Sequence, residues 1–215
     1  MKIPLKRKLL LFLHKFYTPA AWLISGVLPK KIWKNLYFGS FPRPFDEFCA
    51  RYFEGCNDLW AAEVGVFRGN HAKSMLLHCG ISVFYAVDGY RAYNEWENLS
   101  QLMLDAKKQA ARRLSGFRGR VSVIFEEKDC LECWLPQLDI VYIDASHDEK
   151  SVSEQLDHCW KWVAYGGVMG GHDFCDEGTE NISGIKYGVI PAVIKFCEKH
   201  KRKLHVKGDD WWIIK

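Results

Sequence analysis

The stretch Leu59-Trp-Ala-Ala-Glu-Val-Gly-Val-Phe-Arg-Gly-Asn70 contains the turn from a buried strand into a helix. Leu59–Gly65 is a short apolar run that ends in glycine, which is typical of a strand covered on both faces. Gly65 and Gly69 permit a tight turn and let a ligand approach the backbone. Helix-forming residues follow at 71–79. The stretch therefore predicts the first strand–turn–helix unit of a parallel sheet.

The rest of the chain repeats this alternation. Further apolar runs predict strands at 82–88, 120–125, 138–144, 167–172, 203–206 and 211–214. Helical patterns lie at 45–53, 99–114, 151–162 and 189–200. The predicted fold class is α/β, with a Rossmann-like, doubly wound and mostly parallel seven-stranded sheet. In such sheets a ligand binds at the carboxyl ends of the strands, so the polar residues there are the candidates for function.

Composition supports one folded domain preceded by a basic segment. The chain has 215 residues, 48% of them hydrophobic and 26% charged, which excludes disorder for most of its length. Eight of the 30 Lys and Arg residues lie in residues 1–35, where there is no acidic residue. We predict a basic helical arm and linker at 1–44, with Phe41-Pro-Arg-Pro44 as a rigid connection, and the ligand-binding domain at 45–215.

The basic arm has two readings. Its apolar run Leu9–Leu13 is interrupted by His14 and Lys15, so it is too short for a signal peptide or a membrane span. Residues 1–30 either contact a membrane surface as an amphipathic helix or pack on the domain or on a second copy in a homodimer. Without residues 1–35 the charge is 22 minus 26, which makes nucleic acid an unlikely partner. The scattered cysteines are those of a reduced, cytoplasmic protein.

An acidic residue follows the glycine loop at the spacing that is typical of a ribose-binding carboxylate. Asp88 lies 23 residues after Gly65, at the end of the second strand, where a carboxylate accepts hydrogen bonds from a ribose diol. The GxGxxG fingerprint and the phosphate-binding P-loop are both absent. An adenosine-containing ligand without a pyrophosphate fits both facts, and a nicotinamide oxidoreductase does not.

Three motifs carry a family resemblance over about residues 55–214. Glu63-Val-Gly-Val-Phe-Arg-Gly69 resembles motif I of class I S-adenosylmethionine-dependent methyltransferases. Val141-Tyr-Ile-Asp-Ala-Ser-His147 and Gly166-Gly-Val-Met-Gly-Gly-His-Asp173 resemble the fourth- and fifth-strand motifs of the branch with macrocin O-methyltransferase-like and cephalosporin hydroxylase-like proteins. The resemblance implies the class I methyltransferase fold and S-adenosylmethionine as cofactor.

The resemblance also implies roles for individual residues. Glu63, Gly65 and Gly69 would shape the pocket for the methionine part, Asp88 would bind the ribose, and Asp129 would lie near the adenine. The full cofactor-binding set is Glu63, Gly65, Phe67, Gly69, Asn70, Asp88, Asp129 and Asp144.

The chemistry is expected where the fourth and fifth strands end. Asp144 and His147 are the catalytic candidates, with His147 either a general base or a residue that orients Asp144. Asp144, His172 and Asp173 are the candidate ligands of a possible Mg²⁺ ion. His172 departs from the acidic pair common in metal-dependent members. The remaining histidines, His71 among them, are interpreted as structural.

These residues predict an enzyme that methylates an oxygen of a small molecule (a sugar, glycoside or phenol) by in-line displacement, with or without a metal. Two alternatives stay open: a nucleic-acid or protein methyltransferase, and a catalytically inactive cofactor-binding subunit of a larger assembly.

Overall fold

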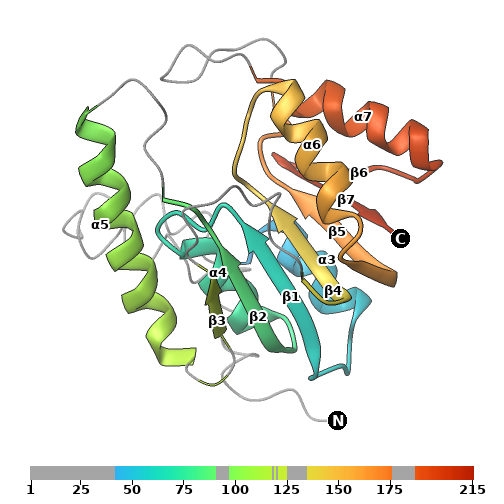
Figure 1. Cartoon of the computed structure of the whole chain (residues 1–215). Coiled ribbons are helices and arrows are strands. Elements are labelled where there is room, and N and C mark those ends of the chain that lie inside the picture. Colours follow the sequence, from blue (N-terminus) through green and yellow to red (C-terminus); the bar gives the residue numbers. More distant parts are fainter. Residues whose placement is uncertain (1–41, 91–96, 118, 120, 125–134, 176–186) are drawn as a thin grey trace, which may run out of the picture. The chain divides into compact units, whose positions relative to one another are not determined.

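The computed structural model describes residues 42–90, 97–117, 119, 121–124, 135–175 and 187–215, all within one compact unit, Pro42–Lys215. Of the predicted arm and linker at 1–44, residues 1–41 lie outside the described residues, and Pro44 is the first residue of helix α3. Helices and strands alternate along the unit as the sequence predicts (Figure 1). The elements are α3 (Pro44–Tyr52), β1 (Leu59–Val64), α4 (Asn70–His78), β2 (Ile81–Val87), α5 (Glu97–Leu114), the 3₁₀ turn η1 (Ser115–Phe117), β3 (Val121–Ile124), β4 (Leu138–Ile143), α6 (Glu149–Cys159), β5 (Val163–Gly171), α7 (Val189–His200), β6 (His205–Lys207) and β7 (Asp210–Ile214).

The strands form a seven-stranded sheet in the order β3-β2-β1-β4-β5-β7-β6. The pairs among β1 to β5 are parallel, whereas β7 runs antiparallel to both β5 and β6. This confirms the prediction of a doubly wound, mostly parallel sheet. The strand order reverses between β1 and β4, so the ligand crevice of such a fold opens at the carboxyl ends of these two strands.

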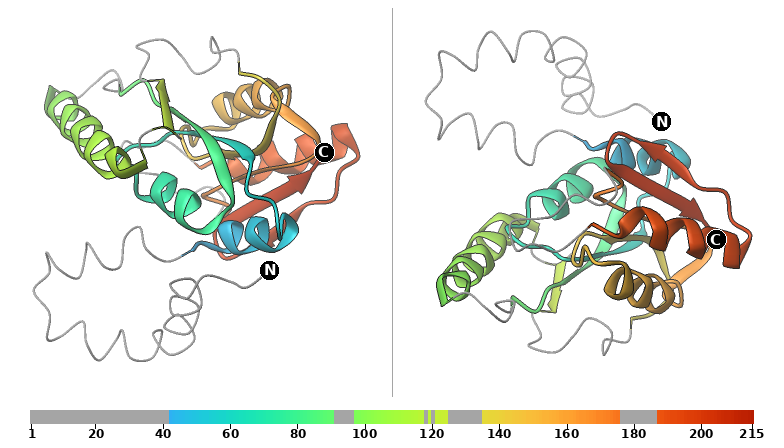
Figure 2. Two further views of the ribbon diagram at one scale, coloured as in Figure 1. Left: turned by 90° about the horizontal axis from the view of Figure 1, so that it is seen from below. Right: turned by 90° about the horizontal axis from the view of Figure 1, so that it is seen from above.

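Helices cover both faces of the sheet (Figure 2). One core cluster joins Ala62 and Val64 of β1 to residues such as Leu156 of α6 and Phe196 of α7. The other joins Ala61 of β1 to side chains of α3, α4 and α5. Successive residues of β1 thus enter opposite cores, as the pleat of a strand requires. This explains why its sequence is a continuous apolar run rather than an alternating one.

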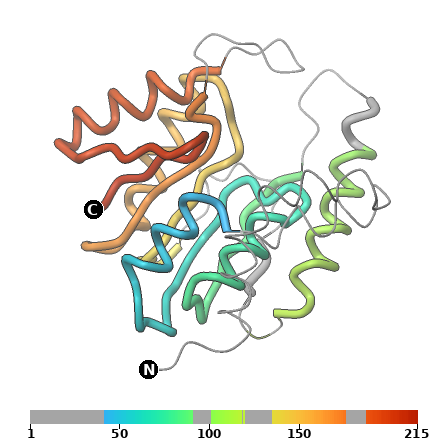
Figure 3. Tube along the Cα trace, turned by 180° about the vertical axis from the view of Figure 1, so that it is seen from behind, coloured from blue at the N-terminus to red at the C-terminus, as the bar shows by residue number. Residues whose placement is uncertain are grey.

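Helix α3 begins one residue before the predicted domain boundary. Arg43 precedes Pro44 in an extended conformation (φ −69°, ψ 164°), as expected for a residue before proline at the first helical position. The helix packs against α4 and β7 (Figure 3), with the Phe48 and Trp212 rings stacked at 5.0 Å. It thereby brings Arg43 to the end of the sheet.

Strand β5 is longer than its glycine-rich motif suggested. It begins at Val163 and not at Gly167, because Val163 pairs with Leu138 of β4 before the register shifts. Among the described helices, none combines the length and the apolar character needed to cross a membrane.

Candidate active site

The loop after β1 is pressed against the end of β4. Gly65 has a φ of +90°, and a Cβ atom there would lie 2.0 Å from the carbonyl oxygen of Asp144. Gly69 has a φ of +71° and would place a Cβ atom 3.1 Å from Cα of Ala110 in α5. Both positions therefore require glycine. This packing brings the loop that follows Glu63 against the backbone of Asp144.

Asp88 is held by two residues with unusual backbone conformations. Its carboxylate accepts hydrogen bonds from the backbone amides of Phe67 (2.7 Å) and Tyr90 (2.8 Å), one to each oxygen. Both donors have a φ of 47°, a strained value for an aromatic residue. The Tyr90 hydroxyl also donates to the Phe67 carbonyl (2.8 Å). Burial raises the pKa of Asp88. Each of its carboxylate oxygens has a second lone pair, which can accept a hydrogen bond from a ribose hydroxyl.

A buried ion cluster lies beneath this loop and under α3. His71 lies 3.0 Å from Asp46 through Nε2 and 3.0 Å from Glu63 through Nδ1. Burial alone would lower the pKa of His71, but the two carboxylates raise it to about 9. The pKa of Glu63 is raised by its burial. Sequence analysis interpreted His71 as structural and missed that it holds Glu63, since a contact between helix and strand leaves no local pattern.

Three buried polar atoms in and beside the glycine loop lack a hydrogen-bond partner among the described residues. They are Oε2 of Glu63, Nε of Arg68 and Oδ1 of Asn70. Buried polar atoms are nearly always paired, so these orphans at the glycine loop are candidate partners for a ligand.

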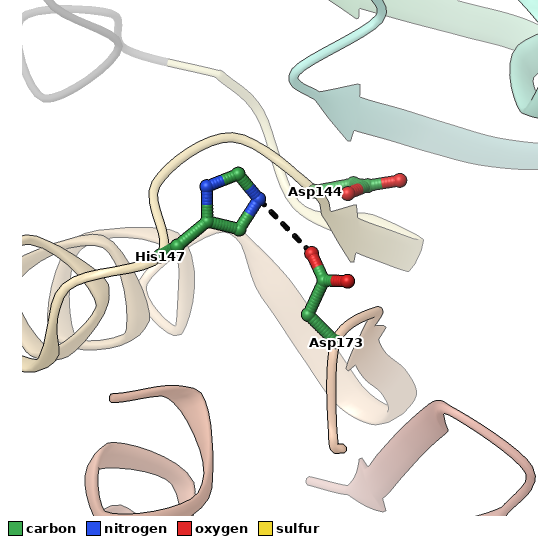
Figure 4. A group of neighbouring side chains, drawn as sticks. All are labelled: Asp144, His147 and Asp173. Carbon is green, nitrogen blue, oxygen red and sulfur yellow. Dashed lines mark ion pairs between the residues drawn. The ribbon is translucent and has the colours of Figure 1, made fainter. Parts of the chain in front are cut away.

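A second cluster stands where β4 and β5 end (Figure 4). Asp144, His147 and Asp173 each offer a ligand atom, and the three atoms lie within 4.8 Å of one another. Nε2 of His147 is 3.0 Å from Oδ2 of Asp173. That hydrogen bond raises the pKa of His147. Burial opposes the ionisation of Asp173, yet hydrogen bonds from His147 and His172 hold its pKa well below the usual range.

His172 is not a member of this three-residue group among the described side chains. Its Nδ1 lies 3.0 Å from the other oxygen of Asp173, Oδ1. Asp173 thus links two histidines, and its φ of 58° lies in the left-handed region. The sequence predicted Asp144, His172 and Asp173 as the metal ligands. In the structure, His147 takes the place of His172 in this group.

Residues 187–188, just before α7, contact His147 of this cluster. The Tyr187 ring meets the His147 ring edge to face at 5.1 Å. The Gly188 amide donates to the His147 carbonyl (2.7 Å). An aromatic wall therefore flanks the imidazole.

Arg43 joins the site from outside all three motifs. Its Nη1 donates to the Tyr142 hydroxyl (2.8 Å) and lies 3.4 Å from Oδ2 of Asp144. The sequence showed this arginine only as part of a linker. The one signal was its place between two prolines, which fixes its backbone at the start of α3.

The predicted residues are thus distributed over one edge of the sheet, with one exception. The loop of Gly65–Asn70 and the carboxylates of Glu63, Asp88, Asp144 and Asp173 all follow or end parallel strands. Asp129 lies outside the described residues.

A family model described as "Methyltransferase domain" matches residues 62–174. The chain belongs to this methyltransferase family. The match spans the glycine loop, Asp88, and the cluster of Asp144, His147 and Asp173. A search of curated proteins gave no significant match.

Solved structures with the same fold include methyltransferases. A Staphylococcus aureus structure described as a caffeoyl-CoA O-methyltransferase has a TM-score of 0.61 at 14% identity, covering 98% of this chain and 99% of that one. An S-adenosylmethionine-dependent O-methyltransferase from Thermotoga maritima has a TM-score of 0.53 at 15% identity, covering 87% and 71%. The O-methyltransferase NovP has a TM-score of 0.54 at 13% identity, covering 80% and 78%. At these identities the likeness concerns the fold.

The protein is an S-adenosylmethionine-dependent methyltransferase of class I, and its residues fit that cofactor. Asp88 retains acceptor capacity for the ribose, and the orphaned Glu63 Oε2 can accept from an ammonium group. The donor set of Asp144, His147 and Asp173 is also compatible with a divalent metal ion.

Proposed function

We propose that this methyltransferase transfers the methyl group to a hydroxyl oxygen of a small molecule, such as a sugar, a glycoside or a phenol. The observation that carries the proposal is the His147–Asp173 pair beside Asp144. A hydroxyl is a poor nucleophile at neutral pH, so its methylation benefits from a group that removes or polarises its proton. Such a group has to stand beside the cofactor, and this cluster follows β4 and β5, next to the glycine loop.

In the first form of the mechanism His147 is the general base. With Nε2 directed at Asp173, the Nδ1 atom of the neutral ring carries the lone pair that accepts the proton of the acceptor hydroxyl. Asp173 fixes the ring and stabilises the imidazolium that forms. Tyr187 packs against the ring and would limit the size of the acceptor. The acceptor oxygen would then attack the methyl carbon in line while the carbon–sulfur bond breaks, which leaves S-adenosylhomocysteine.

The second form assigns the cluster to a divalent metal, because Asp144, His147 and Asp173 come close enough to share one ion. Two carboxylates suit Mg²⁺, whereas the imidazole favours a transition metal such as Mn²⁺. When bound, such an ion would lower the pKa of the acceptor hydroxyl. His147 would then orient a ligand set and would not remove the proton itself.

Methyl-transfer assays with a panel of glycosides and phenols test the proposal. The wild-type enzyme is dialysed against EDTA and assayed alone, with Mg²⁺ and with Mn²⁺. Full activity after dialysis supports His147 as the base, and recovery only with metal supports the second form. His147→Gln is assayed in the same way, and Glu154→Gln, at an exposed position of α6, is its control. Methylation of proteins or nucleic acids but of no small hydroxyl compound would contradict the proposal.

We also propose, as expectations from the sequence, a cytoplasmic location and either membrane-surface contact or homodimer formation through residues 1–30. Those residues lie outside the described part of the chain. Flotation of the full-length protein with anionic vesicles, compared with a variant lacking 1–40, tests the membrane contact. Light scattering of the same two proteins tests the dimer.

A further inference from the structure

Arg43 differs from a purely structural arginine in how its donors are used. Both of its side-chain hydrogen bonds, to Tyr142 and to Asp144, come from Nη1. Nε and Nη2 make no hydrogen bond to the described residues. The side chain is 33% exposed, and a guanidinium has five N–H donors in a planar fork that matches a carboxylate. The free donors are therefore available to a ligand.

The position of Arg43 is fixed by the helix start and by the sheet. Its backbone amide donates to Asp46 (3.1 Å), and Pro44 holds the turn into α3. Its guanidinium lies 5.8 Å from the centre of the Tyr142 ring. Tyr142 in turn donates to Asp210 (2.8 Å). These contacts hold a cation beside Asp144, near the loop that carries the cofactor motif.

The charges around Arg43 match one part of the cofactor. The methionine moiety of S-adenosylmethionine is a zwitterion and requires one anionic and one cationic partner. Glu63 supplies a buried oxygen without a partner among the described residues. Glu63 on β1 is the register partner of Tyr142 on β4, and the Arg43 guanidinium contacts the Tyr142 ring, so Arg43 lies near Glu63. The two side chains thus form an acceptor and a donor for one amino-acid group.

We propose that Arg43 binds the carboxylate of the methionine moiety while it remains in contact with Asp144. This rests on the proposed cofactor and adds a residue that lies outside the family motifs. It also gives Asp144 a fixed orientation when the cofactor is bound, because one guanidinium then contacts both groups.

Three ligands separate this contact from the rest of the site. S-adenosylmethionine has the carboxylate, decarboxylated S-adenosylmethionine lacks only that group, and methylthioadenosine lacks the whole amino-acid end. Their dissociation constants are measured by calorimetry for the wild type, Arg43→Met, Arg43→Lys and Asp88→Asn. We expect Arg43→Met to weaken S-adenosylmethionine binding about 10- to 100-fold, the value of a charged hydrogen-bonded contact. Binding of the other two ligands should change less than about 2-fold.

Arg43→Lys and Asp88→Asn are the controls for the interpretation of Arg43→Met. Arg43→Lys keeps the charge but loses the fork, so S-adenosylmethionine binding should weaken by a smaller factor. If Arg43→Met does not fold, as judged by its thermal melt, the lysine variant provides the same comparison. Asp88→Asn should weaken all three ligands alike, since all carry the ribose.

Equal losses for all three ligands in the Arg43 variants would overturn the assignment, because the residue would then act only on the structure of the site. An unchanged affinity for S-adenosylmethionine would also overturn it. If the folded wild type binds none of the three, the cofactor site itself fails, and the proposed function fails with it.

Discussion

The molecule contains two clusters in which a histidine lies 3.0 Å from a carboxylate, in very different surroundings. Under α3, His71 is 4% exposed and its partners Asp46 and Glu63 are 0% and 2% exposed. At the ends of β4 and β5, His147 is 31% exposed and Asp173 17%. Both clusters are made of imidazole and carboxylate groups, and they differ strongly in burial. The buried cluster can exchange neither protons nor ligands freely, whereas the exposed one can do both.

This difference in burial indicates that the His71 cluster stabilises the fold and that the His147 cluster takes part in catalysis. Taking charges out of water is costly, and removing one partner from a buried set leaves an uncompensated charge. A half-exposed histidine keeps most of its hydration when its partner is lost. The two clusters should therefore respond in opposite ways to the same substitution.

The largest effect is expected from His71→Ala. It leaves Asp46 and Glu63 buried without the cation between them, and we expect a loss of about 3–5 kcal/mol in the free energy of unfolding. Urea unfolding followed by circular dichroism measures it, with Glu154→Ala at an exposed position of α6 as the control. A loss below about 1 kcal/mol would show that the buried cluster is not ionised.

His147→Ala should give the reverse result. We expect methyl transfer to fall about 10²- to 10⁴-fold, the range for loss of an acid–base group. The free energy of unfolding should fall by about 1–2 kcal/mol, less than in His71→Ala, because this hydrogen-bonded pair is only partly buried. The turnover number and urea unfolding of the same preparation provide both values. A large loss of stability with normal turnover would contradict the catalytic role of His147 and would give it a structural role instead.

The comparison also shows what could be predicted from the sequence. The sheet and the residues ending its strands were predictable, because a parallel sheet places the ends of its strands at one edge. Glu63, Asp88 and Asp144 follow from that rule. Gly65 follows from the turn that the rule requires, and its close approach to Asp144 gives the physical reason.

The pairing of side chains was not predictable. Arg43 and Asp144 are 101 positions apart, and no local pattern links a residue between two prolines to the end of a strand. His71 and His147 both stand near the start of a helix, and nothing in their neighbours distinguishes a buried ring from an exposed one. His71 is covered by the packing of α3 on α4 and by the Tyr142 ring of β4.

The pH dependence of stability sharpens the contrast. The folded-state pKa of His71 is about 9, against an ordinary value of 6.5. Its stabilising contribution is therefore complete below about pH 6.5 and is lost as the pH rises through 9. The shift of about 2.5 units corresponds to roughly 3 kcal/mol. Urea unfolding at pH 6, 7.5 and 9.5 should show this loss in the wild type and not in His71→Gln. Equal slopes in the two proteins would assign the loss to other groups.

The smallest effect concerns a single hydrogen bond within the buried cluster. The Ser74 hydroxyl donates to Oδ2 of Asp46 (2.6 Å), and this bond contributes, after the charge of His71, to a pKa of Asp46 below its ordinary value. Ser74→Ala should cost about 1.5–3 kcal/mol, the range for a hydrogen bond to a charged group.

Ser153→Ala is the matched control, because the Ser153 hydroxyl donates to the Glu149 carbonyl on the exposed side of α6. It should change stability by less than about 0.5 kcal/mol. Since a lowered pKa stabilises the fold only above it, the Ser74 variant should also lose stability at a higher pH than the wild type on acidification. If both serine variants behave alike at every pH, then Asp46 does not depend on its buried hydrogen bonds, and burial cannot be what separates the two histidine clusters.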